Sequence, residues 1–451
     1  MEKSSLPFAI VGLGKTGLSI ARYLNKNKID FIAYDTRENL EITNEIDSEI
    51  KNDKIILGSF KEQYIDHHSN FILSPGISFN SNFVDKINKL GKKVYSDIDI
   101  FNQKKKNNVV CITGTNGKTT VTLLIEHMLN SLGKKAKAAG NVGLPVLDIL
   151  EEEYDYHILE LSSFQLETTK EIKSSVSLIT NITEDHLDRH GTFENYVNVK
   201  HKIFKNSNVS IVNRLDKNIK KNNCKIEYSF GEDEPNDTNS FGVKHKNDFS
   251  YIMHNDKELI SCKEFNLIGS HNYINICSAL AVIHALGLNL IDAAKSLKKF
   301  QCVEHRMENF LKSKNLIWIN DSKSTNIYST ISAISSLDDD IVLLMGGRSK
   351  TNDYSHLDKV LKGKVNKLIL FGESRYLIKQ NITSINNISL VENVEDAAKK
   401  ATNAAKKLTD KTGKKVYILL SPACSSYDAF KSYEERGMKF KNYIFEKYRL
   451  N

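Results

Sequence analysis

The sequence predicts an α/β protein of three domains. Its 451 residues are too many for one ordinary core and fit two or three domains of roughly 150 residues each. Short apolar runs of strand length alternate with helix-like stretches, and two glycine-rich turns each lie between a strand-like run and a helix-like stretch. This alternation is typical of parallel sheets covered by helices.

The first predicted domain spans residues 1–106 and contains five strand-like runs. They are residues 8–11, 31–34, 55–57, 71–73 and 94–95. A helix-like stretch at 18–25 follows the first run, as expected for βαβ units. The polar and strongly charged residues 102–108 predict a linker to the next domain.

The second predicted domain spans residues 107–303, and the third spans 304–451. In the second, strand-like runs are 109–113, 157–159 and 177–182, and helix-like stretches are 121–132, 271–287 and 291–300. Its polar tract 236–247 predicts a surface loop or hairpin. In the third, strand-like runs are 316–319, 341–345, 367–371 and 416–420, with a helix-like stretch at 396–408 and an amphipathic terminal helix at 437–450.

The composition, 40% hydrophobic and 26% charged, is ordinary for a globular protein. The net charge of +8 is spread along the chain without a basic, aromatic-rich face, which argues against a nucleic-acid partner. No apolar run approaches the roughly 18 residues of a membrane span, and no signal-peptide pattern follows Met1, so we expect a cytoplasmic protein with no membrane partner. The six cysteines form no Cys-x-x-Cys pair, and we expect small buried side chains rather than disulfides or zinc ligands.

The first glycine-rich turn is Gly12-Leu13-Gly14-Lys15-Thr16-Gly17, and Asp35 ends the next strand-like run. Glycines in such a turn let the backbone approach a pyrophosphate at a helix N-terminus, and a carboxylate such as Asp35 can bond a ribose or a base. On its own the turn fits an NAD-binding dehydrogenase and some other diphosphate ligand about equally. A purely structural turn is the weaker interpretation.

The second glycine-rich turn is Thr113-Gly114-Thr115-Asn116-Gly117-Lys118-Thr119-Thr120. Backbone N–H groups of such a loop surround phosphates, Lys118 meets their negative charge, and the Thr119 hydroxyl can ligate Mg²⁺. The loop departs from the general phosphate-loop pattern, because the first glycine of that pattern would fall at Ile112. A chance Gly-Lys-Thr match is the less favoured alternative.

Two further segments carry candidate metal ligands. Glu160 ends the run 157–159 and opens Glu160-Leu161-Ser162-Ser163-Phe164-Gln165, where a carboxylate is well placed to hold Mg²⁺. The second segment is Thr183-Glu184-Asp185-His186-Leu187-Asp188-Arg189-His190. His186 and His190 could suggest a zinc pair, but no third ligand stands at helical spacing, and an Asp/His loop near ATP favours Mg²⁺.

The order and spacing of these three segments resemble the Mur ligase family, and the resemblance spans nearly the whole chain. It implies a Rossmann-like N-terminal domain, a central P-loop ATPase-like α/β domain and a Rossmann-like C-terminal domain. The implied activity is an ATP-dependent ligation that adds D-glutamate to a UDP-muramoyl-alanine precursor in bacterial peptidoglycan synthesis. The implied steps are formation of an acyl phosphate and its displacement by the glutamate amine, with closure of the third domain assembling the site.

The resemblance also implies site residues, position by position. The UDP-substrate would contact Gly14, Lys15, Thr16, Asp35, Thr36, Arg37, Ser74, Pro75 and Gly76. ATP would contact Gly114, Thr115, Asn116, Gly117, Lys118, Thr119, Thr120, Asn272, Arg306, Asp321 and Lys323. Glutamate would contact Thr325, Lys350, Ser426 and Tyr433. Two Mg²⁺ ions would be held by Thr119, Glu160, His186 and Lys200, the last as a carbamate, and the catalytic residues would be Lys118, Asn141, His186 and Lys200.

Two residues qualify this assignment. Cys424, in Ser421-Pro422-Ala423-Cys424-Ser425-Ser426, is expected to be a packed loop residue and not a nucleophile. Arg348 departs from the family pattern by placing a cation beside the expected glutamate pocket. The expected partners are the three small-molecule substrates alone, and the expected state is a monomer.

Three alternatives stay open at the level of sequence. A folate-polyglutamating ligase uses a related loop but would lack the segment Asp35-Thr36-Arg37. Ligases that add alanine, a diamino acid or a dipeptide share the central domain, whereas the segment 321–326 with Lys350 favours a dicarboxylate. An NAD-linked oxidoreductase or a nucleotide-sensing protein would leave Glu160, His186 and the second loop unexplained. An L-glutamate-adding member of the family is also conceivable.

Overall fold

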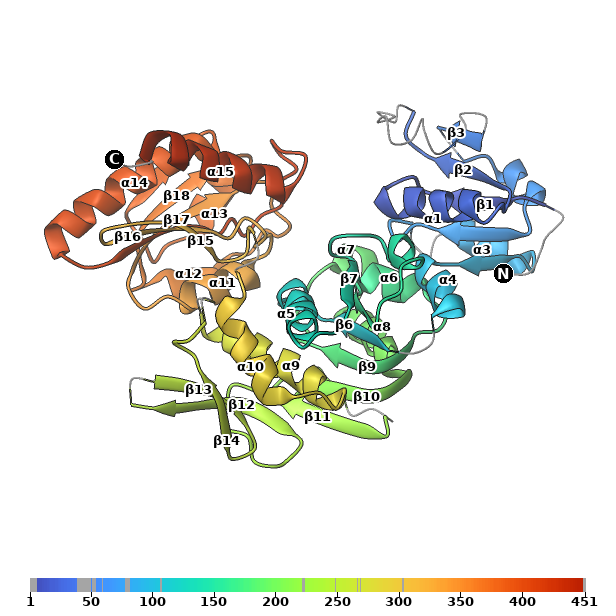
Figure 1. Ribbon diagram of the computed structural model, residues 1–451. Coiled ribbons are helices and arrows are strands. Elements are labelled where there is room, and N and C mark those ends of the chain that lie inside the picture. Colours follow the sequence, from blue (N-terminus) through green and yellow to red (C-terminus); the bar gives the residue numbers. More distant parts are fainter. Residues whose placement is uncertain are drawn as a thin grey trace. The chain divides into compact units, whose positions relative to one another are not determined.

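The computed structural model describes residues 6–38, 50, 54–58, 60–77, 82–105, 108–220, 224–247, 249–265, 267, 269–301 and 304–448. The chain divides into two compact units, residues 1–264 with 274–298 and residues 265–273 with 299–451. Among the described residues, the first unit contains two sheets and the second contains one (Figure 1). The predicted α/β class is confirmed, while the boundaries 1–106, 107–303 and 304–451 stay predictions.

The first sheet is parallel and has the strand order β3-β2-β1-β4-β5. Its strands are β1 (Phe8–Val11), β2 (Phe31–Asp35), β3 (Ile55–Leu57), β4 (Asn70–Leu73) and β5 (Lys93–Tyr95). Its helices are α1 (Lys15–Lys26), η2 (Glu62–His67), α3 (Asn82–Lys89) and α4 (Asp97–Lys104). Because β1 lies between β2 and β4, the loops that follow these three strands meet at one edge of the sheet, where ligands bind in such folds.

The middle sheet has the order β14-β13-β12-β11-β10-β9-β6-β8-β7, parallel except for the antiparallel pairs β12–β13 and β13–β14. Its strands are β6 (Val109–Thr113), β7 (Ala136–Gly140), β8 (Tyr156–Glu160), β9 (Lys173–Ile179), β10 (Asn206–Asn213), β11 (Ile226–Phe230), β12 (Ser240–Lys246), β13 (Phe249–His254) and β14 (Lys257–Ser261). The polar tract 236–247 therefore contains one arm of a hairpin, as predicted.

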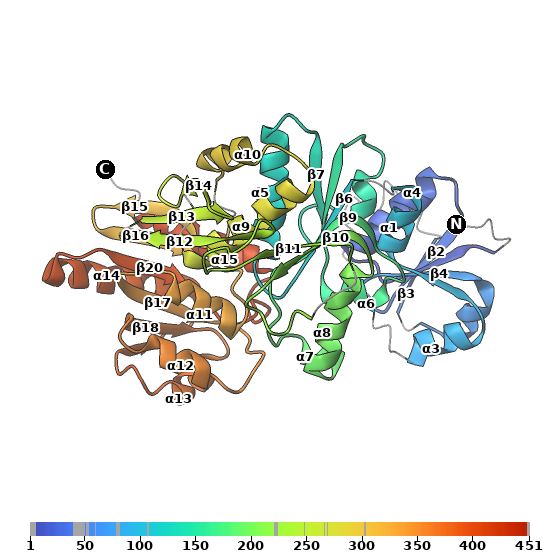
Figure 2. The same cartoon turned by 90° about the horizontal axis from the view of Figure 1, so that it is seen from below.

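The helices that accompany the middle sheet are α5 (Lys118–Ser131), η3 (Val146–Ile149), α6 (Ser163–Thr168), α7 (Leu187–His190), α8 (Phe193–His201), η4 (Lys202–Phe204), α9 (Ser270–Ala285), α10 (Leu290–Ser296) and η5 (Leu297–Lys299). Alternate residues of β6 point to opposite faces of the sheet. Val109 and Cys111 join the core cluster that includes Tyr196 of α8, while α5 lies over the other face (Figure 2).

The third sheet has the order β15-β16-β20-β17-β18-β19, and only the β15–β16 pair is antiparallel. Its strands are β15 (Glu308–Ser313), β16 (Leu316–Asn320), β17 (Asp340–Gly346), β18 (Val365–Phe371), β19 (Ile388–Leu390) and β20 (Val416–Leu420). Its helices are α11 (Ile327–Ser335), α12 (Ser355–Leu361), α13 (Arg375–Asn381), α14 (Val394–Thr412) and α15 (Tyr433–Tyr448). Leu343 and Met345 of β17 face one core cluster, and Val342 and Leu344 face the other.

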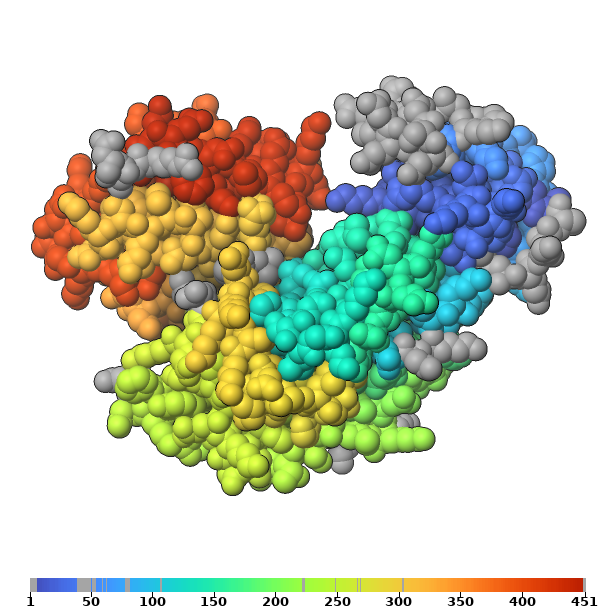
Figure 3. Space-filling model, in the orientation of Figure 1, coloured from blue at the N-terminus to red at the C-terminus, as the bar shows by residue number. Residues whose placement is uncertain are grey.

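The two sheets of the first unit share a core and a polar seam. One cluster of buried residues combines Phe8 of β1 with Val109 of β6. At the seam, the Asp148 carboxylate accepts a hydrogen bond from the Ser19 hydroxyl at 2.7 Å and one from the Arg22 guanidinium at 2.7 Å. The residues of the first sheet and those around α5–α6 lie against each other in the space-filling view (Figure 3). The loops of both sheets are therefore held within one body.

Several element boundaries differ from the predicted ranges, and the start of β9, at Lys173 instead of residue 177, is one of them. Residues 102–104 belong to α4 and not to a linker, because Ser96 and Asp99 form a capping box that starts this helix. Strand β9 ends at Ile179; Thr180 and Asn181 then bond the glycine-rich loop described below, and the Ile182 N–H donates to Asp216. The terminal helix begins at Tyr433 and not at Gly437.

Two sequence-based expectations concern residue environments. Cys111, Cys262, Cys277 and Cys424 are buried free thiols and Cys224 is half-buried, whereas Cys302 lies outside the described residues. Within the part of the chain that the structure describes, no helix combines the length and apolar character needed to cross a membrane.

Leu124 of α5 is fully buried, while Leu215 is 49% exposed. We predict that Leu124→Ala lowers the free energy of unfolding by about 2–5 kcal/mol, because it removes buried methyl groups and leaves a cavity. The same change at Leu215 should cost less than about 0.5 kcal/mol. Chemical denaturation of the two variants measures both values, and equal losses would contradict this packing.

Candidate functional site

The second glycine-rich turn forms a loop between β6 and α5 that is bonded to the segment after β9. The Thr115 N–H donates to the Asn181 carbonyl at 2.8 Å, and the Asn116 N–H donates to Asn181 Oδ1 at 2.9 Å. The Thr115 hydroxyl donates to the Thr183 carbonyl and accepts from the Thr183 N–H, both at 3.0 Å. The glycine-rich loop is thus tied to the start of the motif 183–190 through the Thr115 hydroxyl.

Gly117 begins α5 in the left-handed region, with φ of 82°. A Cβ at this position would lie 2.5 Å from Asn275 Oδ1, so both the conformation and the space require glycine. Gly117 is thus the N-cap of α5, and the N–H groups at the start of a helix are those that bind phosphates in such loops.

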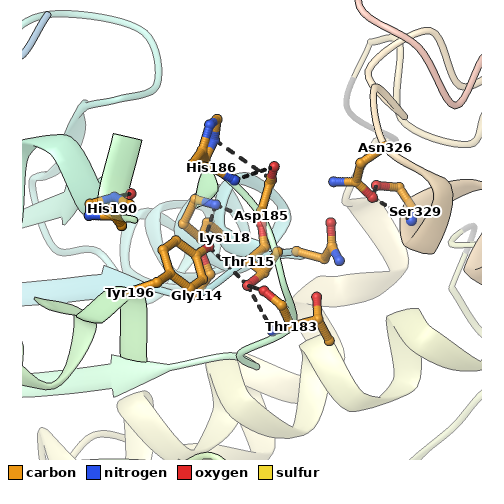
Figure 4. Close-up of polar contacts among 12 residues, drawn as sticks. Gly114, Thr115, Lys118, Thr183, Asp185, His186, His190, Tyr196, Asn326 and Ser329 are labelled. Atoms are coloured by element: carbon orange, nitrogen blue, oxygen red, sulfur yellow. Dashed lines mark hydrogen bonds and ion pairs between the residues drawn. The ribbon is translucent and has the colours of Figure 1, made fainter. Parts of the chain in front are cut away.

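Lys118 and Lys200 share one acceptor. The Gly114 carbonyl accepts from Lys118 Nζ at 2.8 Å (Figure 4). It also accepts from Lys200 Nζ at 2.7 Å. Lys200 is 1% exposed and its Nζ lies 4.7 Å from the Tyr196 ring centroid. Burial, and then the charge of Lys118, hold the pKa of Lys200 well below its usual range. Burial and the neighbouring Lys118 charge thus both disfavour the protonated form of Lys200.

Glu160 lies at the end of β8 and accepts hydrogen bonds from two other predicted site residues. Its Oε2 accepts from the Thr119 hydroxyl at 2.7 Å, and its Oε1 accepts from Asn141 Nδ2 at 2.8 Å. The Asn141 N–H also donates to the Glu160 carbonyl at 2.9 Å. Glu160 is 1% exposed. A buried carboxylate beside a hydroxyl, at the start of a phosphate-binding helix, is a set of hard oxygen donors that suits Mg²⁺.

His186 lies in the left-handed region, with φ of 53°, and caps the short helix α7. Its Nε2 is 3.6 Å from Asp185 Oδ2, and its side chain is 36% exposed. Asp185 and His186 lie beside Lys118 in Figure 4. His190 points elsewhere, because its Nε2 is 3.0 Å from the Ser163 hydroxyl. Among the described residues no three His, Cys, Asp or Glu side chains form a metal-binding group.

The first glycine-rich turn is closed by Asp35. Its Oδ2 accepts from the Leu13 N–H at 2.7 Å, and both carboxylate oxygens accept from the Arg37 guanidinium at 2.8 Å. The bond from Arg37 is the main reason that the pKa of Asp35 is lowered to about 2. Asp35 is 8% exposed, so it acts first as a clamp between this turn and Arg37. The sequence had suggested only a direct ligand contact for this carboxylate.

The other predicted substrate residues border the same edge. Gly14 and Lys15 are exposed and Thr16 is half-buried at the start of α1, while Thr36 is exposed after β2. The loop Ser74-Pro75-Gly76 follows β4, and the Ser74 N–H donates to the Val11 carbonyl at 2.9 Å. These three loops follow β1, β2 and β4, which are adjacent strands.

Arg189 joins this edge to the middle sheet. Its guanidinium donates to the carbonyls of Pro75, Gly76 and Ile77 at 3.0–3.2 Å and to Glu167 Oε2 at 2.9 Å. Sequence reasoning gave Arg189 no role, although its place in the motif 183–190, three residues after His186, was a usable signal.

The remaining predicted residues belong to the second unit. Asn272 is buried, Arg306 is half-buried, and Lys350 is exposed. Asp321 is buried; it accepts from the Met307 N–H at 3.1 Å and from the Ser421 hydroxyl at 2.9 Å, and burial raises its pKa to about 6. Ser426 is 3% exposed. Lys323 Nζ lies 3.8 Å from the centroid of the Tyr433 ring.

The backbone brings several of these residues together. The Thr325 N–H donates to the Lys323 carbonyl at 2.8 Å, and the Lys323 N–H donates to the His305 carbonyl at 3.1 Å. Arg348 is exposed and pairs with Glu373 at 3.1 Å. Cys424 is fully buried against Tyr354 and Ser374, as expected of a packed residue. Sequence reasoning missed Arg436, a fully buried arginine that bonds the loops around Ser322 and Ser425.

Comparison with known proteins identifies the family. Residues 112–283 match the model of the Mur ligase middle domain, and residues 7–96 match that of the Mur ligase MurD-like N-terminal domain. The UDP-N-acetylmuramoylalanine--D-glutamate ligase of Legionella pneumophila (strain Paris) is 34% identical over 447 residues, which cover 97% of this chain and 98% of that protein. The chain belongs to the Mur ligase family. The ligase of the same name from Coxiella burnetii (strain CbuK_Q154) is 35% identical to this Mur ligase, with 98% of each chain covered.

Solved structures agree with the fold of this Mur ligase. The UDP-N-acetylmuramate-alanine ligase MurC of Thermotoga maritima superposes with a TM-score of 0.60 at 18% identity, covering 98% of this chain and 100% of that one. The folylpolyglutamate synthase of Mycobacterium tuberculosis gives a TM-score of 0.59 at 13% identity, covering 77% and 94%. The fold alone therefore does not separate the Mur ligases from the folate ligase.

We predict that Arg37→Met raises the pKa of Asp35 toward its ordinary value, because the main bond that lowers it is lost. A carboxylate with a depressed folded-state pKa stabilises the folded chain above its unfolded-state value, near pH 4, and this contribution disappears as the pH falls through about 2. The stability difference between wild type and variant should thus be constant above about pH 4 and shrink between about pH 4 and pH 2.

Thermal unfolding of both proteins across this pH range measures the difference. Arg375→Met is the matched control, because Arg375 donates to the Gly372 carbonyl instead of a carboxylate. The stability change of this control should not vary with pH in the same window. A pH-independent difference for Arg37→Met as well would contradict the clamp.

Proposed function

We propose that this Mur ligase is the ATP-dependent enzyme that adds D-glutamate to UDP-N-acetylmuramoyl-L-alanine in peptidoglycan synthesis. The main support is the convergence of Lys118, Thr119, Glu160, Asn141 and Lys200 around one phosphate-type loop. Curated relatives that match over 97–98% of the chain carry the name of this activity. The small-molecule substrates are ATP, D-glutamate and the UDP-precursor, and a cytoplasmic location is part of the proposal.

The reaction has two steps. The carboxylate of the alanine residue attacks the γ-phosphorus of ATP, which forms an acyl phosphate and releases ADP. The amine of D-glutamate then attacks the acyl carbon, and inorganic phosphate leaves. Both attacks bring together groups rich in negative charge, so the barrier depends on positioned cations and N–H donors.

The residues of the first unit suit the first step. The Lys118 ammonium and the N–H groups at the start of α5 would donate hydrogen bonds to the ATP phosphates. The other proposed ATP contacts in this loop are Gly114, Thr115, Asn116, Gly117, Thr119 and Thr120. Asn141 Nδ2 is held in position by Glu160, so its amide is preorganised. Thr119 and Glu160 would hold one Mg²⁺, and His186 with a carbamate on Lys200 would hold a second. When bound, Mg²⁺ neutralises charge on phosphate oxygens.

A carbamate at Lys200 is supported by the surroundings of the amine. Carbamylation requires an uncharged amine, and Lys200 is buried, close to the charge of Lys118, and has a lowered pKa. The modification would replace a second cation beside Lys118 with an oxygen ligand. This change would also remove the repulsion between two ammonium groups that share the Gly114 carbonyl.

The first sheet supports a UDP-linked substrate over the folate alternative. Gly14, Lys15 and Thr16 would bind the diphosphate at the N-terminus of α1, and Asp35, Thr36, Arg37, Ser74, Pro75 and Gly76 would surround the uracil end. A MurD-like N-terminal domain model matches residues 7–96, which contain all of these positions. In the second unit, the proposed ATP contacts are Asn272, Arg306, Asp321 and Lys323, and the proposed glutamate contacts are Thr325, Lys350, Ser426 and Tyr433.

The substrate assignment is tested with purified protein, ATP, Mg²⁺ and UDP-N-acetylmuramoyl-L-alanine. We predict that phosphate release depends on D-glutamate and is at least about tenfold slower with L-glutamate, L-lysine or diaminopimelate, which place the charged groups differently. A preference for L-glutamate would correct the stereochemistry. Phosphate release with a folate and none with the UDP-precursor would refute the proposal.

We predict that Lys200→Ala lowers turnover by about a hundredfold or more, and that acetate partly restores it by supplying a carboxylate in the vacated space. Lys202→Ala is the matched control, because Lys202 donates to the carbonyls of Leu166 and Glu167 and should not respond to acetate. A carbamate signal in the ¹³C NMR spectrum of wild type with ¹³C-bicarbonate, absent from Lys200→Ala, gives a readout besides activity. Full activity of Lys200→Ala would remove Lys200 from the site.

A further inference from the structure

Arg436 lies in the first turns of α15 and its side chain is completely buried. A guanidinium removed from water is costly unless its N–H groups are bonded. A cation near the N-terminus of a helix also opposes the helix dipole. Burial lowers the pKa of Arg436 to about 10, which leaves the group charged at neutral pH. Both the burial of the charge and the helix dipole disfavour Arg436 at this position, so its hydrogen bonds must offset these two costs.

The contacts of Arg436 are all to uncharged groups on three separate loops. Its Nε donates to the Ser322 hydroxyl at 3.0 Å, and its Nη2 donates to the Ser322 carbonyl at 2.8 Å. Its Nη1 lies 3.2 Å from the Gly346 carbonyl, 3.1 Å from that of Cys424 and 3.2 Å from that of Ser425. Every nitrogen of the guanidinium donates at least one hydrogen bond, and the side chain has no exposed surface on which a substrate could contact it.

The three loops are those that carry the proposed glutamate residues. Residues 321–326 include Thr325, residues 346–350 include Lys350, and residues 421–426 include Ser426. They are also joined directly. The Ala423 N–H donates to the Ser324 carbonyl at 2.9 Å, and Arg348 and Ser425 exchange two backbone bonds of 2.9 Å. The rigid fork of Arg436 therefore fixes the spacing of loops that could otherwise move apart.

The helix that holds Arg436 is itself seated closely. A Cβ on Gly437 would lie 2.3 Å from His305 Nδ1 and 3.0 Å from Asn320 Oδ1. The Tyr433 carbonyl accepts from the Ser322 hydroxyl at 2.8 Å, which ties the first residue of α15 to the same loop. The start of α15, which includes the predicted contact residue Tyr433, is thus fixed against the loop 321–326.

We propose that Arg436 is a positioning residue that sets the affinity for the amino-acid substrate by holding these three loops at a fixed spacing, without touching the substrate. This inference rests on the proposed function, because it takes the loops to be the glutamate site. It deepens that function by naming the residue on which the shape of the pocket depends.

The test compares Arg436→Lys with Ile444→Ala. A lysine keeps the charge but ends in one nitrogen, which cannot reach all three loops. Ile444 is a fully buried residue of the same helix that faces the apolar core, so its truncation destabilises the unit without touching the loops. We expect Arg436→Lys to raise the KM for D-glutamate roughly tenfold or more, with KM values for ATP and the UDP-precursor changed less than about twofold.

Ile444→Ala should show a lower melting temperature and unchanged KM values. Equal KM changes for all three substrates in Arg436→Lys, or the same pattern in both variants, would overturn the inference and leave only a structural role. If Arg436→Lys does not fold, Ser322→Ala decides, because it removes one acceptor of Arg436 and is expected to raise the KM for D-glutamate by about threefold. An unchanged KM in Ser322→Ala would also overturn it.

The amino-acid preference of the wild-type enzyme distinguishes failure of the proposed function from failure of the proposed role of Arg436. A wild type that uses another amino acid would refute the proposed function, and the KM for that amino acid would then be measured in the same variants. A wild type that uses D-glutamate, with Arg436→Lys indistinguishable from it, would leave the proposed function standing and refute the role of Arg436.

Discussion

Strand β6 lies between β8 and β9 in parallel register, and the site of the first unit depends on this adjacency. The register pairs Ile112 with Glu160 on one side and Thr113 with Ile179 on the other. The chain therefore leaves all three strands at the same edge, where Glu160, the loop from Gly114 and the segment 180–183 meet. In this arrangement the Thr115 hydroxyl bonds both the carbonyl and the N–H of Thr183. The metal and phosphate chemistry proposed for the unit follows from the position of one strand.

Lys200 and Arg436 are both buried, and the energetic cost of burying a charged group is met differently at the two positions. Lys200 has a carbonyl that it shares with Lys118, and its amine can lose its proton or be modified. Arg436 cannot be neutralised in this way, and the chain instead provides it with one hydroxyl and four carbonyl oxygens. The first solution suits a residue whose chemistry changes, and the second suits a residue that must stay in place.

Much of the fold was predictable from the sequence, because buried parallel strands read as short apolar runs. The predicted runs 8–11, 55–57, 109–113 and 416–420 agree with β1, β3, β6 and β20 at both ends. The start of α4 was missed, although the capping pair Ser96 and Asp99 is a local signal that outweighs the polar composition after it. The end of β9 was placed too late, because the apolar Ile182 extends the run while its backbone bonds Asp216.

Site residues that belong to a local sequence motif could be predicted. Contacts between residues far apart in the sequence could not. The loop from Gly114 to Thr120 and the carboxylate of Glu160 are recognisable from neighbouring residues. The clamp between Asp35 and Leu13, and the bonds of Arg436 to residues 114 and 90 positions away, join segments whose separation in sequence gives no periodic signal. Arg436 immediately precedes the predicted terminal helix 437–450, and an arginine is normally exposed, so composition alone assigns it to the surface.

The bonds of Arg189 to the carbonyls of residues 75–77 have a mechanical consequence. Arg189 belongs to α7, a helix of four residues whose capping residue is His186. Such a short element has little freedom to bend, so a displacement of the loop after β4 would pull α7 with it and reorient the imidazole at its start. The loop after β4 and the orientation of His186 beside Lys118 are thus linked through a single side chain, Arg189.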